Sequence, residues 1–266
     1  MVKEYYRPSS VEEALELLAV PGAQALAGGT FTLAFDARDK PARIVDISRT
    51  VPRSIEATPA ALRIGAAATF QELIESDAAP AVLKAAAGSM ANRNTRNRAT
   101  VGGNLGANKS CSSLAPTLLV LGASVEYRER GKPAATLPLA EWLATPAGLL
   151  LTILVPASRG ARAASLRASR TACDIATATV ACLYRLEDGR MTGVRVAVGG
   201  FGPHAALRHD IAAVLEGGPL PPKAMIEKAV VALLSAIGDQ RGSAEYKCLR
   251  GAALVADALY AAEEIV

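Results

Sequence analysis

The sequence predicts an α/β (α+β) protein in two parts. The N-terminal part alternates strands and helices, and the smaller C-terminal part has an antiparallel sheet covered by helices on one side. Three observations predict this fold. Short strand patterns alternate with helical patterns over residues 1–158, as in α/β units. The pair Asp188-Gly189 separates two strand patterns and is the strongest hairpin signal in the chain. Two long helical patterns, at residues 223–237 and 245–262, end the sequence.

The beginning of the chain predicts one strand and helix unit. Residues 10–13 (SVEE) form a capping-box pattern, in which the Ser hydroxyl and the Glu carboxylate bond free backbone amides. This pattern opens an apolar-periodic helix that runs to about Leu18. Strand patterns follow at residues 25–27 and 43–47. We therefore expect a first subdomain at about residues 1–55.

A second unit follows with the same rhythm. Residues 62–69 alternate like a strand and end in Thr69, which is placed to cap a helix at residues 70–75. The remaining patterns are helices at residues 81–90 and 138–143, an apolar run at 114–121, and strands at 123–128 and 149–155.

The segment at residues 156–164, rich in Ser, Gly, Ala and Arg, predicts a domain boundary. We expect an N-terminal domain at residues 1–158, whose second subdomain begins near residue 56, and a C-terminal domain at residues 159–266. The two hairpin strands are expected at residues 175–186 and 191–198.

Composition and charge exclude several classes of protein. An apolar content of 51% indicates a compact globular protein, yet no charge-free apolar run reaches the roughly 18 residues that a membrane-spanning helix needs. The net charge is only +4, and basic residues are spread along the chain except for Arg93, Arg96 and Arg98, so nucleic-acid binding is not indicated. The first residues lack the features of a secretory signal, so we expect a cytoplasmic protein.

The cysteines and histidines indicate no metal site. Four scattered cysteines form no CxxC pair of the kind that zinc and iron–sulfur sites use. His204 and His209 lie five residues apart, a spacing that suits neither a helical metal pair nor a catalytic dyad. Redox chemistry on this chain would therefore need a bound organic cofactor.

Two Gly-Gly pairs, Gly28-Gly29 and Gly102-Gly103, are the candidate binding features. Paired glycines after a strand permit positive φ values and close approach of a ligand, so that successive N–H groups converge on phosphate oxygens. A pyrophosphate is the natural ligand of such a turn. Each pair alone is equally consistent with a tight turn that binds nothing. Further donors to the same anion would be Thr30, Thr32, Thr100 and Asn104.

Neither pair fits the better-known phosphate-binding motifs. The second pair lacks the glycine spacing of a Rossmann loop, and Lys109 does not complete a P-loop, so a kinase or an NAD dehydrogenase is disfavoured. Arg96 and Arg98 precede the second pair, where they either lend positive charge to a dinucleotide or a partner subunit, or are simply solvated.

Residues 94–105 (NTRNRATVGGNL) resemble the signature of the FAD-binding medium subunit of the molybdenum hydroxylase family, the xanthine dehydrogenase and carbon monoxide dehydrogenase type. Residues 27–30 (AGGT) resemble that family's first pyrophosphate loop, and the similarity extends through residues 149–156 and 243–247 to essentially the whole chain. Within the family the chain is most similar to a branch of selenate reductase FAD-binding subunits, which share residues 241–247.

The resemblance implies an FAD-binding domain of the PCMH/VAO type, with two subdomains and the flavin between them, followed by a C-terminal domain of the CO dehydrogenase flavoprotein type. It implies FAD on this chain, molybdopterin on a large partner subunit and 2Fe-2S clusters on a small one. The chain would then be an oxidoreductase subunit that passes electrons between those clusters and NAD or another carrier, and that does not act on substrate alone.

The resemblance also assigns cofactor-binding residues by position. Leu150 would line the flavin pocket, and Arg167 would lie near the isoalloxazine ring, whose reactivity a protein tunes through hydrogen bonds and charge. No catalytic residue and no metal ligand is assigned. The full set is Ala27, Gly28, Gly29, Thr30, Phe31, Thr32, Thr100, Val101, Gly102, Gly103, Asn104, Ser113, Leu150 and Arg167.

One departure from the family pattern leaves alternatives open. Most members carry an acidic residue downstream of the second Gly pair, where it binds a ribose-type hydroxyl, but Ser113 lies near that position here. Loss of a charge-assisted hydrogen bond weakens FAD binding by about 1–3 kcal/mol. A structural or assembly subunit that no longer binds flavin is therefore the rival hypothesis, and a free-standing flavin reductase is a third. The sequence identifies neither the substrate of the complex, nor its electron acceptor, nor the oligomeric state.

Overall fold

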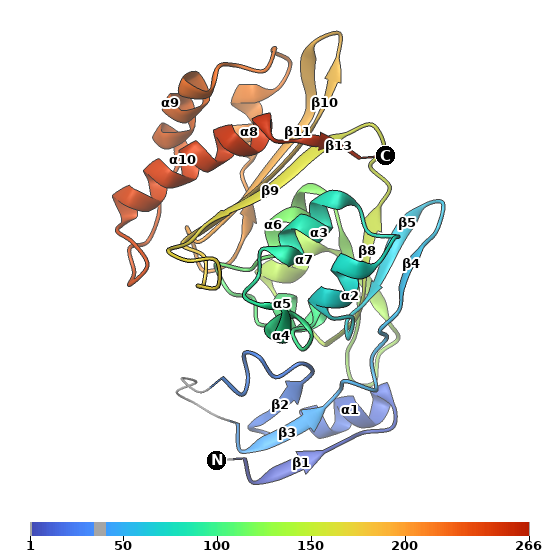
Figure 1. The fold of residues 1–266 in the computed structure, drawn as a ribbon. Helices are drawn as coiled ribbons and strands as arrows, with labels where there is room; N and C mark the ends of the chain where they lie inside the picture. The colour runs from blue at the N-terminus through green and yellow to red at the C-terminus, as the bar shows by residue number, and fades with distance from the viewer. Residues whose placement is uncertain (1, 35–40, 266) are drawn as a thin grey trace.

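A computed structural model describes residues 2–34 and 41–265. Within them the strands form three sheets, which follow one another along the chain (Figure 1). The first sheet is parallel, with the order β1-β3-β2: β1 (Glu4–Tyr6), β3 (Arg43–Asp46) and β2 (Ala23–Leu26). Helix α1 (Val11–Leu18) packs on this sheet through Ala14 and Leu15.

The N-terminus of α1 confirms the predicted helix start but changes the capping box. The Ser10 hydroxyl accepts a hydrogen bond from the Glu13 amide at 3.1 Å, as the pattern predicts. The Glu13 carboxylate, however, accepts from the amide of Ser9 at 2.7 Å and not from that of Ser10. Helix α2 (Phe70–Glu75) has the complete reciprocal box, formed by Thr69 and Glu72.

The second sheet is antiparallel, with the order β4-β5-β8-β6-β7. Its central strand, β8 (Leu149–Pro156), buries Leu149, Leu150, Ile153 and Val155. The other strands are β4 (Ile55–Ala57), β5 (Ala61–Gly65), β6 (Ser124–Arg128) and β7 (Ala135–Pro138). The helices beside this sheet are α2, α3 (Ala81–Gly88), α4 (Arg93–Arg96), α5 (Val101–Gly106), α6 (Ala115–Val120) and α7 (Leu139–Ala144).

The third sheet is also antiparallel, with the order β12-β11-β10-β9-β13. The predicted hairpin joins β10 to β11 through Asp188 and Gly189, whose φ values of 50° and 75° are those of a primed hairpin turn. The strands are β9 (Arg162–Ala168), β10 (Ala178–Glu187), β11 (Arg190–Gly199), β12 (Ala206–Leu207) and β13 (Glu263–Glu264).

Strand β10 shows how the third sheet is covered on both faces. Val180 and Cys182 belong to the core under the C-terminal helices, whereas Ala181 and Leu183 belong to the core shared with α6. Every residue of α6 is buried, because this helix lies between the third sheet and the rest of the N-terminal part. The C-terminal helices are α8 (His209–Leu215), α9 (Lys223–Leu233) and α10 (Ala244–Tyr260), all on one face of the sheet (Figure 1).

The structure therefore confirms the α/β fold with an antiparallel sheet and helices in its C-terminal part. Helix α9 ends four residues before the prediction, because Leu234 adopts an extended conformation with ψ of 135°. The edge strands β1, β4, β7, β12 and β13 were not predicted, since each has only two to four residues. In the part of the chain that the structure describes, no helix is long and apolar enough to cross a membrane.

Candidate functional site

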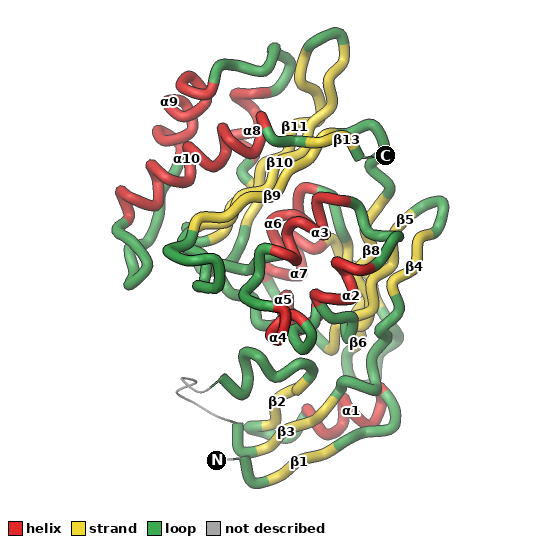
Figure 2. Tube along the Cα trace, in the orientation of Figure 1, coloured by secondary structure: helices red, strands yellow, loops and turns green. Residues whose placement is uncertain are grey.

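A cavity of about 860 Å³ lies where the loop after β2, the start of α5 and loops of the C-terminal part meet. Figure 2 shows the loop after β2 facing α4 and α5. The cavity brings together all the residues assigned to the cofactor except Val101, which is fully buried in the core. Its lining includes Ala27, Gly28, Gly29, Thr30, Phe31, Thr32, Thr100, Gly102, Gly103, Asn104, Ser113, Leu150 and Arg167.

The loop after β2 offers free backbone donors to the cavity. The amides of residues 28–32 have no hydrogen-bond acceptor among the residues that the structure describes. The loop is closed on its other side, because the amide of Leu33 donates to the carbonyl of Gly29 at 3.1 Å. Successive amides that face one cavity are a binding site for phosphate oxygens.

Glycine is required at the two positions of this loop for different physical reasons. Gly29 has φ of 73°, a left-handed conformation that L side chains rarely adopt. Gly28 has ordinary φ, but a Cβ there would lie 1.8 Å from the carbonyl oxygen of Arg98. The Arg98 side chain in turn donates from Nε to the carbonyl of Gly28 at 3.2 Å. Arg98 therefore joins the first loop to the segment that precedes α5.

The second Gly pair is not the predicted turn, because Gly102 and Gly103 lie in the first turn of α5 and neither has positive φ. Their amides are also not free to bind an anion. The Gly102 amide donates to the carbonyl of Ala66 at 2.9 Å, and the Gly103 amide donates to the Thr100 hydroxyl at 3.0 Å. The amide of Val101 donates to Ala68, and that of Asn104 to Thr100. The hypothesis that both Gly pairs present amides to a phosphate is therefore wrong for the second pair.

Close packing explains why glycine occupies these two positions. A Cβ on Gly102 would lie 2.6 Å from the Cβ of Ala66 and 2.8 Å from its carbonyl oxygen. A Cβ on Gly103 would lie 2.7 Å from the Thr100 hydroxyl. Gly102 thus lets α5 approach the loop after β5, and Gly103 leaves room for the capping hydroxyl of Thr100. The start of α5 lines the cavity wall.

Asn104 and the segment after α5 form another part of the wall. The side-chain oxygen of Asn104 accepts from the Ser112 hydroxyl at 2.6 Å, which leaves the side-chain NH₂ group without a protein acceptor among the described residues. The Ser112 hydroxyl also accepts from the amide of Ala115 at the start of α6. Ser113 lines the cavity, and no hydrogen bond of its hydroxyl is found among the described residues. No sequence pattern indicated Ser112.

Apolar surface comes from Leu150, which is 6% exposed, and from Trp142, which sequence reasoning missed. The Trp142 indole donates to the carbonyl of Ala147 at 3.0 Å. Of the other aromatic residues, Phe31 lies at the cavity, whereas Phe70 and Phe201 are buried in the cores.

Arg167 lies in the wall as expected, but its donors are directed to backbone carbonyls. Nη1 donates to Asp174 at 3.0 Å, and Nη2 donates to Thr171 and Ala172. Arg167 therefore holds the loop at residues 171–174, two of whose residues, Cys173 and Asp174, also line the cavity.

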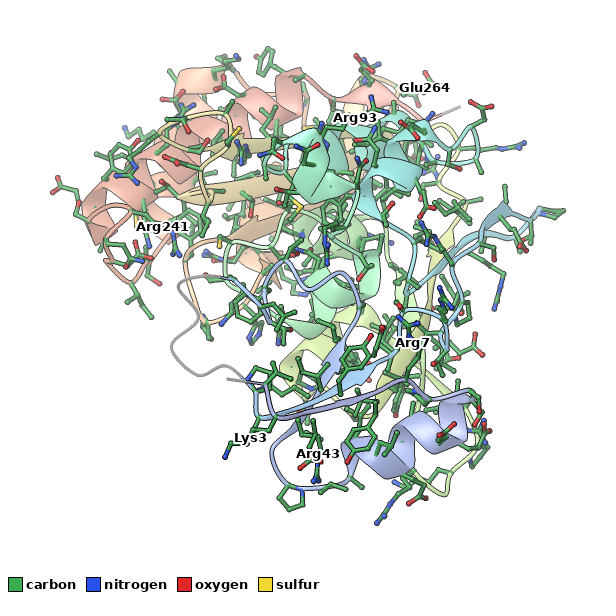
Figure 3. All side chains as sticks on the ribbon, turned by 60° about the horizontal axis from the view of Figure 1, so that its bottom comes forward. Lys3, Arg7, Arg43, Arg93, Arg241 and Glu264 are labelled. Atoms are coloured by element: carbon green, nitrogen blue, oxygen red, sulfur yellow. The ribbon has the colours of Figure 1, made fainter. Side chains whose placement is uncertain are left out.

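A second cation of the C-terminal part, Arg241, lines the cavity from the loop between α9 and α10. Figure 3 labels its side chain. Its guanidinium bonds the Asp239 carboxylate at 3.0 Å, and the same carboxylate bonds the almost fully buried Lys247 at 3.1 Å. Burial alone would raise the pKa of Asp239, but hydrogen bonds from Arg241 and Lys247 outweigh it and hold that pKa below its usual value.

Arg96 does not reach the cavity. Its side chain donates to the carbonyls of Met90 and Ala91 and to Gln71, so it organises the turn before α4. Arg96 is therefore not directed at the cavity, and its donors are bonded to protein acceptors rather than only to solvent. A role of its charge toward a partner subunit stays a prediction.

The fold and the cavity define a class, a two-part α/β protein with one cavity lined from both parts. Among the described residues this cavity has amides without an acceptor, apolar walls and more cations than carboxylates, which suits a dinucleotide cofactor. The family model "FAD binding domain in molybdopterin dehydrogenase" matches residues 1–158, and "CO dehydrogenase flavoprotein C-terminal domain" matches residues 164–262. The chain belongs to the family of FAD-binding medium subunits of xanthine dehydrogenase and CO dehydrogenase type oxidoreductases.

Individual relatives agree with this assignment. The uncharacterized protein YgfM of Escherichia coli is 32% identical, over 98% of this chain and 96% of its own. A xanthine dehydrogenase FAD-binding subunit of Escherichia coli O157:H7 is 34% identical, over 75% and 74%. A carbon monoxide dehydrogenase structure from Hydrogenophaga pseudoflava superposes with a TM-score of 0.88 at 28% identity, over 98% and 97%. The predicted closeness to selenate reductase subunits is not tested by these relatives and stays a prediction.

Proposed function

We propose that this chain binds FAD in the cavity and passes electrons between the 2Fe-2S clusters of a small partner subunit and NAD or another carrier. A molybdopterin-binding large subunit would act on the substrate of the complex. The observation that supports this proposal most directly is the loop at residues 28–32, which lines a cavity with cationic and apolar walls and whose amides have no acceptor among the described residues. Such amides suit the diphosphate of a dinucleotide.

In this proposal, different residues of the cavity contact different parts of the cofactor. The amides of residues 28–32, with the hydroxyls of Thr30 and Thr32, bind the diphosphate oxygens. The start of α5 supplies a wall without side chains at Gly102 and Gly103, while Thr100 and Asn104 flank it. Leu150 and Trp142 provide apolar contact for an aromatic ring system. When bound, FAD supplies the reversible uptake of electrons that no side chain of the cavity provides.

The domain organisation belongs to the same proposal. The FAD-binding domain would span residues 1–158, with subdomains at about 1–55 and 56–158, and the C-terminal domain residues 159–266. The C-terminal domain would complete the cofactor site through Arg167 and Arg241. The cytoplasmic location of the protein stays a prediction.

The absorption spectrum of the purified protein tests flavin binding. We expect a yellow protein with flavin bands in the visible range, or a colourless one that acquires those bands when FAD is added and unbound FAD is removed. A colourless protein that takes up no FAD would contradict the proposal.

One observation favours a second candidate, a structural subunit that keeps the fold and docks its partners without flavin. Ser113 stands at the position of the usual acidic residue, and it is uncharged. In this case the protein takes up no FAD yet still co-purifies with a large and a small subunit. A third candidate, a free flavin reductase, requires the isolated chain to oxidise NADH or NADPH at the expense of added flavin.

Co-expression tests the partners directly. If the chain is the medium subunit of a complex, it elutes together with a molybdopterin-binding chain and a 2Fe-2S chain encoded beside it. Reduction of its flavin by NADH in that complex would identify NAD as the carrier, and reduction only through the partner subunits would point to another carrier.

A further inference from the structure

Among the residues that the structure describes, the cavity wall holds more positive than negative side chains. These cations are Lys109, Arg167 and Arg241, and the carboxylate is Asp174. Within the same described ranges, each of these groups except Lys109 has a polar protein partner. Arg167 donates to the carbonyls of the 171–174 loop, Arg241 pairs with Asp239, and Asp174 pairs with Arg170 at 3.3 Å.

Lys109 is held by an aromatic ring instead. Its ammonium lies 4.5 Å from the centroid of the Phe31 ring, a cation–π contact. Within the part of the chain that the structure describes, Lys109 has neither a carboxylate partner nor a carbonyl acceptor for its ammonium. A cation over a ring keeps its N–H donors available on the side away from the ring.

The position of Phe31 places the Lys109 ammonium near the first Gly loop. Phe31 belongs to the loop whose amides at residues 28–32 are free, so the ammonium lies against the same loop. The amides supply hydrogen-bond donors but no net charge, whereas a diphosphate carries two negative charges. Transfer of those charges into a partly enclosed site is costly unless a cation accompanies them.

We infer that Lys109 is the cation that neutralises the diphosphate of the bound cofactor, with Phe31 holding it in place before binding. The inference rests on the proposed binding of FAD. The lysine is a compact charge on a flexible stem, which suits a diphosphate that lies along a loop. Binding of FAD exchanges part of the cation–π contact for ion pairs with phosphate oxygens.

The inference also gives a reason for Ser113. Lys109 and Ser113 line the same cavity from one short segment. A carboxylate at position 113 would compete with the diphosphate for the ammonium or repel the diphosphate itself. The neutral serine leaves Lys109 to the cofactor, so one charge-assisted contact is lost at the ribose while another is gained at the diphosphate.

The test is titration of the apoprotein with FAD, followed by quenching of flavin fluorescence, for wild type, Lys109→Met, Lys109→Arg and Lys228→Met. Lys228 is an exposed residue of α9 that does not line the cavity, so its variant has the same loss of net charge as Lys109→Met. Thermal unfolding of all four proteins shows that they remain folded. Each titration is done at about 20 mM and about 500 mM KCl, where screening differs strongly.

We expect Lys109→Met to raise the Kd for FAD about 10- to 100-fold at low salt, the range of one charge-assisted hydrogen bond. Lys109→Arg should stay within about threefold of wild type, since the charge remains, and Lys228→Met should equal wild type. The wild-type Kd should rise with salt, and that of Lys109→Met should rise much less. If Lys109→Met should fail to fold, the salt dependence of the Kd for FAD is compared among wild type, Lys109→Arg and Lys228→Met. A wild-type Kd that does not change with salt overturns the inference.

The outcomes separate the inference from the function on which it rests. If wild type binds FAD and Lys109→Met binds it equally well, the role of Lys109 is refuted while FAD binding stands. If Lys228→Met weakens binding as much as Lys109→Met, the effect is one of overall charge and the inference is again refuted. If wild type takes up no FAD, the proposed function itself fails.

Discussion

Substitution of Gly102 by alanine tests the packing role of the second Gly pair. The added Cβ would lie 2.6 Å from the Cβ of Ala66 and 2.8 Å from its carbonyl oxygen, and Ala66 is buried. Since neither the carbonyl nor a Cβ can rotate away as the end of a long side chain can, α5 must move outward. That movement strains the hydrogen bond from the Gly102 amide to the Ala66 carbonyl, now 2.9 Å.

The expected cost follows from three contributions. Overpacking of a tight contact costs about 1–3 kcal/mol, and loss of the hydrogen bond costs about 1 kcal/mol more. Against these, alanine is favoured over glycine in a helix by about 1 kcal/mol. We therefore expect Gly102→Ala to lower the free energy of unfolding by about 1–3 kcal/mol.

Gly106→Ala is the matched control, because Gly106 lies in the same helix and no heavy atom lies within 4 Å of its added Cβ. The same propensity term then acts alone, and we expect stability to be unchanged or raised by about 0.4–1 kcal/mol. The assay is urea unfolding followed by circular dichroism, with the two variants compared at equal m-values. Equal stability of the two variants would refute the packing explanation of Gly102.

Three other predictions follow from burial, charge and capping. Burial raises the pKa of the Cys182 thiol to about 12, so iodoacetamide at pH 8 should label exposed Cys173 and spare Cys182 in the folded protein; mass spectrometry showing equal labelling would contradict this. Asp239→Asn removes the counter-charge of buried Lys247 and should cost about 2–3 kcal/mol at pH 7, below the cost for a fully buried pair because Asp239 is partly exposed. The native pKa of Asp239 lies below 3.8, so the ion pair stabilises the wild type above that pH and is lost as the pH falls further. The difference in the free energy of unfolding between wild type and Asp239→Asn, measured by urea unfolding, should therefore become smaller only below about pH 4. A difference that already becomes smaller between pH 7 and 5 would contradict this prediction. Thr69→Ala removes the capping box of α2 and should cost about 1 kcal/mol by the same assay, whereas Thr58→Ala in an exposed turn should cost less.

The elements that the sequence predicts well are those with a local physical cause. Thr69 precedes a helix, and its hydroxyl bonds an amide three residues away, so the pattern contains both partners of the interaction. The hairpin at Asp188 and Gly189 is similar, because the two residues that tolerate positive φ are adjacent in the chain. Such signals need no knowledge of the rest of the fold.

The pairing of distant strands has no comparable signal. Strand β1 lies beside β3, with Glu4 opposite Arg43, and β13, near the end of the chain, lies beside β9. The edge strands β1 and β13 are too short to show a period of two. Their place is decided by packing of the whole chain, which short windows of sequence do not contain.

The two Gly pairs also differ in whether their role has a local cause or depends on a distant segment. Identical dipeptides led to one expectation, free amides in a turn, but only the loop after β2 meets it. The amides of the second pair are satisfied by Ala66 and Thr100, and the reason for Gly102 is its short distance to Ala66, a residue of another segment of the chain. A sequence pattern shows that a Cβ is absent at Gly102 without showing which neighbour excludes it.

Lys109 shows how a residue changes meaning once its surroundings are known. In the sequence it is a lysine that fails to complete a P-loop, and Ser113 is a missing acid. In the fold both line the cavity, and the lysine lies over Phe31 beside the free amides of the first loop. The electrostatic cost of binding a diphosphate depends on the total charge of the site. A neutral residue in place of a carboxylate near Lys109, which has no carboxylate partner among the described residues, therefore favours an anionic ligand. The loss of the acid is therefore not by itself a reason to expect the loss of FAD.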